Sequence, residues 1–246
     1  MSKRIQLVIF TLVGLAPFGF AAPAVKIINL TGEVKIRRGM EENWHRAVAG
    51  MRLEEIDTIL TGEASAVVLE TAEGSTFRLG SYSILDIADL RKITERELFL
   101  YLMSQKVNRI EPRLEKTRLR IGNVSVIHGE SKAGSSHRAA ESPYGRLPER
   151  QNWVQETNGA KALFEQDYYP NTIVKLHKIL AKYPDVEDCG EIHFYLGKAF
   201  EALGKPGQAI DAYKVVLERV AMEGCENAEA GQRAGEAKSA MERLRR

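Results

Sequence analysis

The spacing of hydrophobic residues changes once along the chain. Between residues 25 and 128, apolar and polar residues alternate or apolar residues form short runs, which is the pattern of β-strands. After residue 153, apolar residues recur every three or four positions, as they do on the buried face of a helix. The change predicts a multidomain β + α chain, with an N-terminal β-sandwich or roll followed by α-helical hairpin repeats.

Eight short strands are expected in the first region, and they are separated by turn residues such as Thr31-Gly32 and Thr61-Gly62. Short strands at this spacing favour a sandwich or rolled sheet over a parallel α/β sheet, while the strand order stays open. The expected strands cover residues 25–30, 33–38, 65–70, 76–80, 84–88, 97–103, 117–122 and 124–128.

Two segments predict boundaries. Residues 131–152 are rich in Ser, Gly, Pro and Arg without apolar periodicity, which is typical of a flexible linker. At the N-terminus, basic residues precede an apolar run and an Ala-x-Ala spacing that ends at Ala24, the layout of a secretory signal peptide. The expected division is a signal peptide (1–24), a β-domain (25–130), the linker (131–152) and a helical domain (153–246). An uncleaved N-terminal helix that anchors the chain is the alternative.

Export changes the interpretation of the two cysteines, Cys189 and Cys225. In an oxidising compartment, a pair of cysteines favours a structural disulfide. Neither a CxxC spacing nor a nearby histidine pair supports a metal site, so two free thiols are the alternative.

The helical region contains an internal repeat. An offset of 37 residues places small residues on small residues and bulky residues on bulky ones, with Gly197 and Ala209 at positions where two helices could cross closely. With Pro184 at the end of the first repeat, the pattern resembles the tetratricopeptide repeat (TPR), and Glu156 replaces the tryptophan usual in that family. The resemblance implies a shallow groove lined by the first helix of each pair, and a protein that docks there. The candidate partner-binding residues are His193, Lys198 and Glu201.

The β-rich region also resembles a known family. A Gly-x-Val segment, a tryptophan, an "L…D.I.TG..S" stretch and a Gly-Ser hairpin resemble the FecR domain, with Glu55-Ile56 at a turn where that family has glycine. The resemblance implies an extracytoplasmic sensing or binding module. The matching positions are Gly32, Val34, Trp44, Gly50, Leu53, Asp57, Ile59, Thr61, Gly62, Ser65, Ala66, Leu69, Gly74, Ser75 and Leu79.

Charge and motifs narrow the function. The chain has 35 basic and 33 acidic residues, so its net charge does not favour nucleic acid as a partner. Motifs of nucleophilic, metal-dependent and nucleotide-binding enzymes are absent from the sequence, which favours a non-catalytic protein without a cofactor. Residues 106–120 are locally basic. They are interpreted either as a solvated face or as an anion-binding patch for an envelope polymer or an acidic protein surface, formed by Lys106, Arg109, Arg113, Lys116, Arg118 and Arg120.

Together these patterns predict an exported binding or scaffold protein of the cell envelope, periplasmic or extracellular. Its β-domain is expected to bind an envelope ligand or partner, and its helical domain to dock a protein. No stable membrane span is expected after cleavage. The alternatives are a membrane-tethered FecR-like sensor component, held by the uncleaved N-terminal helix, and an enzyme of unrecognised type.

Overall fold

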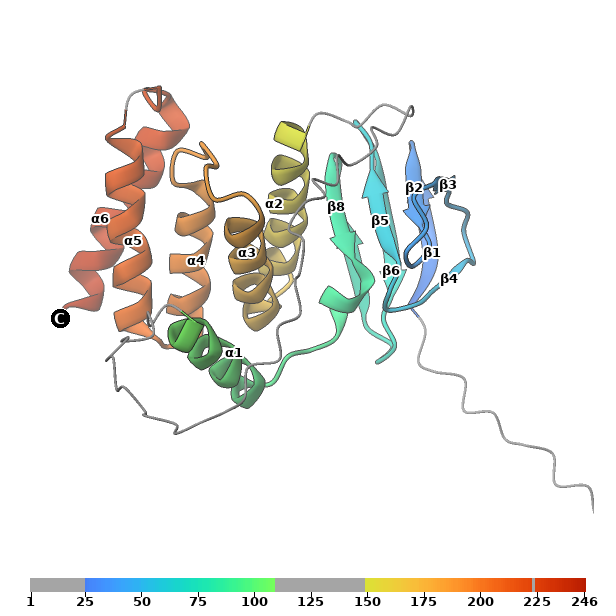
Figure 1. Ribbon diagram of the computed structural model, residues 1–246, viewed down its shortest axis with the longest axis horizontal. Coiled ribbons are helices and arrows are strands. Elements are labelled where there is room, and N and C mark those ends of the chain that lie inside the picture. The colour runs from blue at the N-terminus through green and yellow to red at the C-terminus, as the bar shows by residue number, and fades with distance from the viewer. Residues whose placement is uncertain (1–24, 109–148, 223) are drawn as a thin grey trace, which may run out of the picture.

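The computed structural model describes residues 25–108, 149–222 and 224–246. It contains two four-stranded antiparallel sheets followed by helices, so the expected order of β then α elements is confirmed (Figure 1). The strands are β1 (Val25–Thr31), β2 (Val34–Arg37), β3 (Trp44–Arg46), β4 (Arg52–Leu53), β5 (Thr58–Thr61), β6 (Ala66–Glu70), β7 (Thr76–Leu79) and β8 (Ser83–Asp86). The helices are the 3-10 helix η1 (Ile87–Leu90), α1 (Glu95–Asn108), α2 (Glu149–Glu165), α3 (Tyr169–Lys182), α4 (Glu191–Ala202), α5 (Pro206–Val220) and α6 (Ala228–Leu244).

The two sheets pack on a shared core. Their strand orders are β4-β1-β6-β7 and β3-β2-β5-β8. Alternate residues point inward, and fully buried side chains such as Ile27, Leu69 and Phe77 from one sheet meet Ile36 and Leu85 from the other. The alternation of the sequence is therefore the alternation of buried and exposed faces.

Buried polar side chains hold the turns of the sandwich. The carboxylate of Asp57 accepts hydrogen bonds from Arg38 Nη1 (2.6 Å), Gly39 N (3.1 Å) and Glu54 N (2.9 Å). At Gly32, whose φ is +74°, a Cβ atom would lie 2.4 Å from Ser65 Oγ, so only glycine fits. Positions of the FecR-like pattern thus have direct roles in turn geometry.

The strand expected at residues 97–103 is wrong, because this run is part of helix α1. Thr94 and Glu97 form a capping box: Glu97 N donates to Thr94 Oγ1 (3.2 Å) and Thr94 N donates to Glu97 Oε2 (2.8 Å). The backbone and side-chain hydrogen bonds from Thr94, together with Arg91, lower the pKa of Glu97 to about 2. A continuous apolar run is ambiguous between strand and helix, and the cap decides for helix.

Other expectations differ in detail. Strand β8 ends at Asp86 and continues as η1, so only the first half of the expected strand 84–88 is extended. Strands β3, β4 and β5 were not expected from the sequence. Strands β3 and β4 have only three and two residues, and β5 ends at Thr61, which was interpreted as part of a turn. Helix α2 begins at Glu149, inside the expected linker. The signal peptide, the strands at 117–122 and 124–128, and residues 131–148 of the linker lie outside the described residues.

The helices form consecutive packed pairs, α2 with α3 and α4 with α5, and α6 covers the last pair (Figure 1). A Cβ atom on Gly197 would lie 2.5 Å from Tyr213 Cε1, so the small residue admits the ring of the neighbouring helix. Ala209, also expected at a close crossing, is fully buried. Helix α6 buries a stripe formed mainly by alanines, with Ala230, Ala237 and Met241 among its buried residues.

Helix α2 packs directly on the sandwich. Its residues Ala162 and Leu163 belong to the core of the sheets. A Cβ atom on Gly159 would lie 2.1 Å from the carbonyl oxygen of Ile84 in β8, so the helix axis can come this close only at a glycine. The side-chain amide of Gln166 accepts from Arg78 N (2.7 Å) and donates to Arg78 O (2.8 Å), as a neighbouring strand would. Helix α2 therefore closes the β7 and β8 edges of both sheets.

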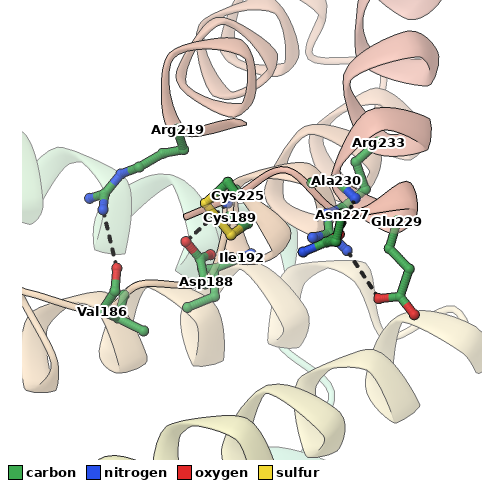
Figure 2. Close-up of a disulfide and its surroundings, with 11 residues drawn as sticks. Val186, Asp188, Cys189, Ile192, Arg219, Cys225, Asn227, Glu229, Ala230 and Arg233 are labelled. Atoms are coloured by element: carbon green, nitrogen blue, oxygen red, sulfur yellow. Dashed lines mark hydrogen bonds and ion pairs between the residues drawn. A yellow bond between two sulfur atoms is a disulfide. The ribbon is translucent and has the colours of Figure 1, made fainter. Parts of the chain in front are cut away.

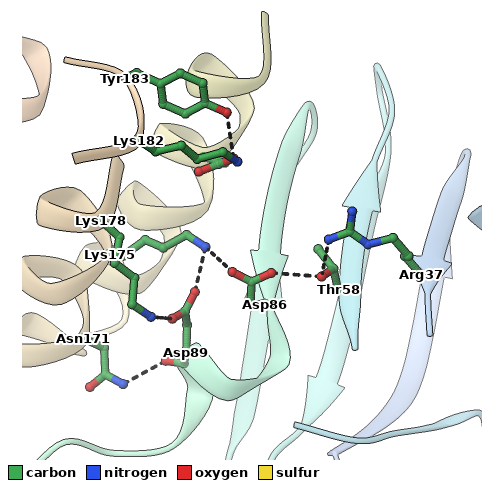
Figure 3. A network of polar contacts seen from close by, with 10 residues as sticks. Arg37, Thr58, Asp86, Asp89, Asn171, Lys175, Lys178, Lys182 and Tyr183 are labelled. Atoms are coloured by element: carbon green, nitrogen blue, oxygen red, sulfur yellow. Dashed lines mark hydrogen bonds and ion pairs between the residues drawn. The ribbon is translucent and has the colours of Figure 1, made fainter. Parts of the chain in front are cut away.

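An ion-pair network adds a second contact between sheets and helices (Figure 3). The ammonium of Lys175, whose side chain is 3% exposed, lies 2.7 Å from Asp86 Oδ2 and 2.8 Å from Asp89 Oδ2. Burial alone would lower the pKa of Lys175, but the charges and hydrogen bonds of the two carboxylates outweigh it and raise the pKa. Asn171 Nδ2 donates to the carbonyl of Asp89 (2.8 Å). The β and α regions thus share both apolar and ionic contacts.

Candidate partner-binding groove

A groove runs between helices α2, α4 and α6. It consists of two adjoining cavities of about 530 and 350 Å³, which share Phe194, Lys198 and Glu236. Helix α4 supplies one wall through residues three or four positions apart, which lie on one helix face. The residues lining the groove are Lys161, Phe164, Glu191, Phe194, Tyr195, Lys198, Glu201, Ala202, Tyr213, Glu229, Gln232, Arg233, Gly235, Glu236, Ser239, Ala240 and Arg243.

Lys198 occupies the centre of the groove. Its ammonium lies 5.4 Å from the ring centroid of Phe164, 5.3 Å from that of Phe194 and 6.0 Å from that of Tyr195. These are cation–π distances. Among the described residues no carboxylate lies within ion-pair distance of Lys198, although the groove contains several. This ammonium is therefore free to pair with an anionic group of a ligand.

Most of the neighbouring charges are already paired, whereas Glu236 makes no ion pair in the described part of the chain and accepts a hydrogen bond from Gln232 Nε2 (2.9 Å). Lys161 Nζ lies 2.9 Å from Glu191 Oε1, and Arg243 pairs with Glu201. Burial lowers the pKa of Lys161, but the hydrogen bond and charge of Glu191 outweigh it and raise the pKa. The hydroxyl of Tyr213 donates to Glu201 Oε2 (3.0 Å), and burial, then the charge of Glu201, raises the pKa of Tyr213. The groove can thus offer aromatic surface, one unpaired cation (Lys198), one unpaired carboxylate (Glu236) and a rim of paired charges.

The three partner-binding residues expected from the sequence do not lie together. Lys198 and Glu201 line the groove. His193 does not line it, and the charges that act on its imidazole belong to Asp188, Arg219 and Glu218. Burial lowers the pKa of His193, and its Nδ1 has no hydrogen-bond partner among the described residues.

Sequence reasoning missed the contributions of α2 and α6 to the groove. Phe164 reaches it from α2, and Glu236 and Arg243 reach it from α6. The alanine stripe of α6 could have indicated this contribution. When the stripe packs inward, the polar residues that border it lie close to the neighbouring helix and can line a groove there.

The expected anion-binding patch is described only at Lys106, which is exposed near the end of α1. Arg109, Arg113, Lys116, Arg118 and Arg120 lie outside the described residues. Lys106 does not line the groove.

The expected disulfide is present in the structure. Cys189 and Cys225 are bonded, and their Cα atoms are 5.4 Å apart (Figure 2). Beside them, Asp188 accepts hydrogen bonds from Gly190 N (3.1 Å) and Ile192 N (2.7 Å) at the start of α4, and Asn227 Oδ1 accepts from Ala230 N (2.8 Å) at the start of α6. The bond therefore joins the starts of two helices that line the groove.

No protein-family model, curated protein or solved structure matches this chain. Within residues 25–108, 149–222 and 224–246, no helix is long and apolar enough to cross a membrane. The same residues contain no group of three or more His, Cys, Asp or Glu side chains arranged to hold a metal ion.

Proposed function

We propose that this chain is an exported, non-catalytic binding protein of the cell envelope, in which a FecR-like β-domain is joined to a TPR-like helical domain that docks a protein segment. The groove with Lys198 at its centre carries the proposal. Its aromatic side chains suit an apolar residue of the partner, and its unpaired ammonium suits a neighbouring carboxylate. The partner segment is therefore acidic and contains at least one large apolar side chain.

The disulfide supports export, because such bonds persist in oxidising compartments. The charged and apolar N-terminal residues support cleavage after Ala24. The mature protein recovered from an envelope fraction should begin at Val25 by intact mass. A chain that still begins at Met1 or Ser2 in the membrane pellet would favour the tethered sensor instead.

Docking is tested with a photo-cross-linking amino acid placed at Ser239, which lines the groove, in the full-length protein in its own cells. The matched control is Lys238, the next residue on α6, which is exposed and does not line the groove. Adducts should form from position 239 and not from position 238. Equal adducts from both positions would show that the groove is not the docking site.

The role of Lys198 is tested by Lys198→Glu, with Lys238→Glu as the control of equal charge change. Reversing the central charge should weaken binding of the cross-linked partner roughly tenfold or more, because the partner's carboxylate then meets a like charge. The control should bind as the unmodified protein does. If Lys198→Glu binds equally well, the acidic-segment proposal is wrong even where the groove itself is the docking site.

A further inference from the structure

Helix α1 has apolar residues on two opposite faces. One face carries Leu98, Tyr101 and Leu102, which pack on the helical core, where the ring of Tyr101 stacks on that of His177 in α3. The other face carries Phe99, Leu100 and Met103, whose exposed fractions are 56%, 58% and 41%. At about 100° per residue, these three side chains span about 100° of the helix circumference, on the side roughly opposite the buried one.

This outward stripe is bounded by two cations and by one carboxylate, the exposed Glu95 one turn before Phe99. Arg96 lies one turn before Phe99, and Lys106 lies one turn after Met103, and both are exposed. Neither has a carboxylate within ion-pair distance in the described part of the chain. The sequence directly after the helix adds five further basic residues up to Arg120, against two acidic ones, Glu111 and Glu115. In Figure 1, α1 lies across the α2–α5 array rather than between its helices.

An exposed face of three large apolar side chains, with a cation at each end, has the chemistry of a surface that inserts shallowly into a lipid interface. The apolar side chains enter the region between headgroups and acyl chains, and the cations pair with lipid phosphates. We propose that α1 docks this protein on an anionic lipid surface through Phe99, Leu100 and Met103, flanked by Arg96 and Lys106. This surface is separate from the groove, so the proposal goes beyond the proposed function.

Charge complementarity favours a lipid surface over the chain itself. If two copies met through α1, Arg96 or Lys106 of one copy would face a cation of the other in either orientation, and the single Glu95 of each copy would offset only part of this repulsion. If the basic residues that follow α1 in the sequence covered the apolar stripe, their charges would likewise meet those of Arg96 and Lys106. An anionic surface removes this repulsion and buries the apolar stripe at the same time.

Sedimentation with vesicles tests the proposal on the full mature chain. The protein should bind vesicles of equal parts phosphatidylcholine and phosphatidylglycerol, and more weakly those of phosphatidylcholine alone. The triple variant Phe99→Ser/Leu100→Ser/Met103→Ser should lose roughly a hundred-fold in binding, because each side chain contributes about 1 kcal/mol on partial burial in the interface. The fold of the variant is checked by circular dichroism and by its melting temperature. The control variant Met40→Ser/Ile56→Ser removes two exposed apolar side chains of the sandwich and should bind as the unmodified chain does.

Charge is tested separately by Arg96→Glu/Lys106→Glu, which should weaken binding to the anionic vesicles roughly tenfold or more and leave binding to neutral vesicles unchanged. An environment-sensitive fluorophore on Leu100→Cys should shift to the blue when anionic vesicles are added. Emission that is already blue in buffer would show that the chain covers this face itself, and would overturn the proposal. Failure of the unmodified protein to bind anionic vesicles would also overturn the proposal. If the protein bound polyglutamate instead, and Phe99 was needed for that binding, the face would belong to an acidic protein partner. Each readout uses purified protein without a groove ligand, so failure here leaves the groove proposal standing.

Discussion

The two ends of the helical array are held in different ways. At the α2–α3 end, large side chains such as Leu163 and Tyr168 enter the core of the sandwich, and Lys175 bridges two carboxylates of the sheet region (Figure 3). At the α6 end, the buried residues are mainly alanines, and a disulfide fixes the start of the helix (Figure 2). A small apolar face buries little area, so a covalent bond supplies what packing does not.

The largest expected effect concerns the ionic contact at the α3 end. Lys175→Ala should lower the free energy of unfolding by about 3–5 kcal/mol, because it leaves two carboxylates without their buried cation. The control is Lys178→Ala, which removes a cation whose side chain is 56% exposed and which lies 3.3 Å from Asp89, and it should cost less than about 1 kcal/mol. Guanidinium unfolding measures both. Equal losses would mean that burial of Lys175 does not matter.

The next effect concerns the α6 end. Replacing both Cys189 and Cys225 by serine should cost about 2–4 kcal/mol, because the closed loop no longer restricts the unfolded chain. Amide hydrogen exchange should accelerate in α6 and stay unchanged in β6 of the sandwich. The unmodified protein with reductant should behave like the variant. Unchanged exchange in α6 would show that the alanine face alone holds the helix.

Two glycines allow a direct comparison of the ends. Gly159→Ala in α2 should destabilise the protein by about 1–3 kcal/mol, because the added Cβ would meet the carbonyl of Ile84. Gly231→Ala in α6 meets nothing within 4 Å and should stabilise by up to about 1 kcal/mol, since alanine favours helix. Thermal unfolding of the two variants measures the difference in sign. A stabilising Gly159→Ala would mean that α2 does not approach β8 so closely.

The sequence predicts the helices at the two ends of the array better than it predicts the contacts between them and the sheets. The 37-residue offset located Gly197 and Ala209 because repeated helix crossings need repeated small residues. The pairing of Gln166 with Arg78, 88 residues away, leaves no local pattern, since any polar residue suits the turn that follows a helix. The closure of the sheets by α2 was therefore not predictable from spacing.

The candidate groove was likewise only partly predictable from the sequence, because repeat spacing identifies helices but not their contacts. Lys198 was expected to face a partner because it lies on the first helix of a pair, and it does line the groove. Whether His193 or Phe194 faces the groove depends on a rotation of about 100°, which helix bounds known only to within a few residues do not determine. The contribution of α6 to the groove depends on the rotation between successive helices. The side chains packed where the helices cross determine that rotation, and the sequence spacing does not give it.

The smallest expected effect is a pH dependence that separates the two ends. Burial raises the pKa of Asp86, but the charge and hydrogen bond of Lys175 and the hydrogen bond from Thr58 (2.9 Å) outweigh it and lower the pKa. A carboxyl whose pKa is lower in the folded state stabilises the protein above its unfolded pKa of about 3.9, and that contribution is lost as the pH falls through the folded value. The free energy of unfolding should therefore decline as the pH falls below about 4, and Asp86→Asn should reduce the slope. The control Asp211→Asn removes an exposed carboxylate of α5 and should keep the slope of the unmodified protein.

Because Asp86 lies at the sheet contact, the hydrogen-exchange protection of α3 should respond to pH more than that of α6, where the disulfide does not titrate in this range. Equal responses of the two helices would show that acid acts on the protein as a whole rather than through this ion pair.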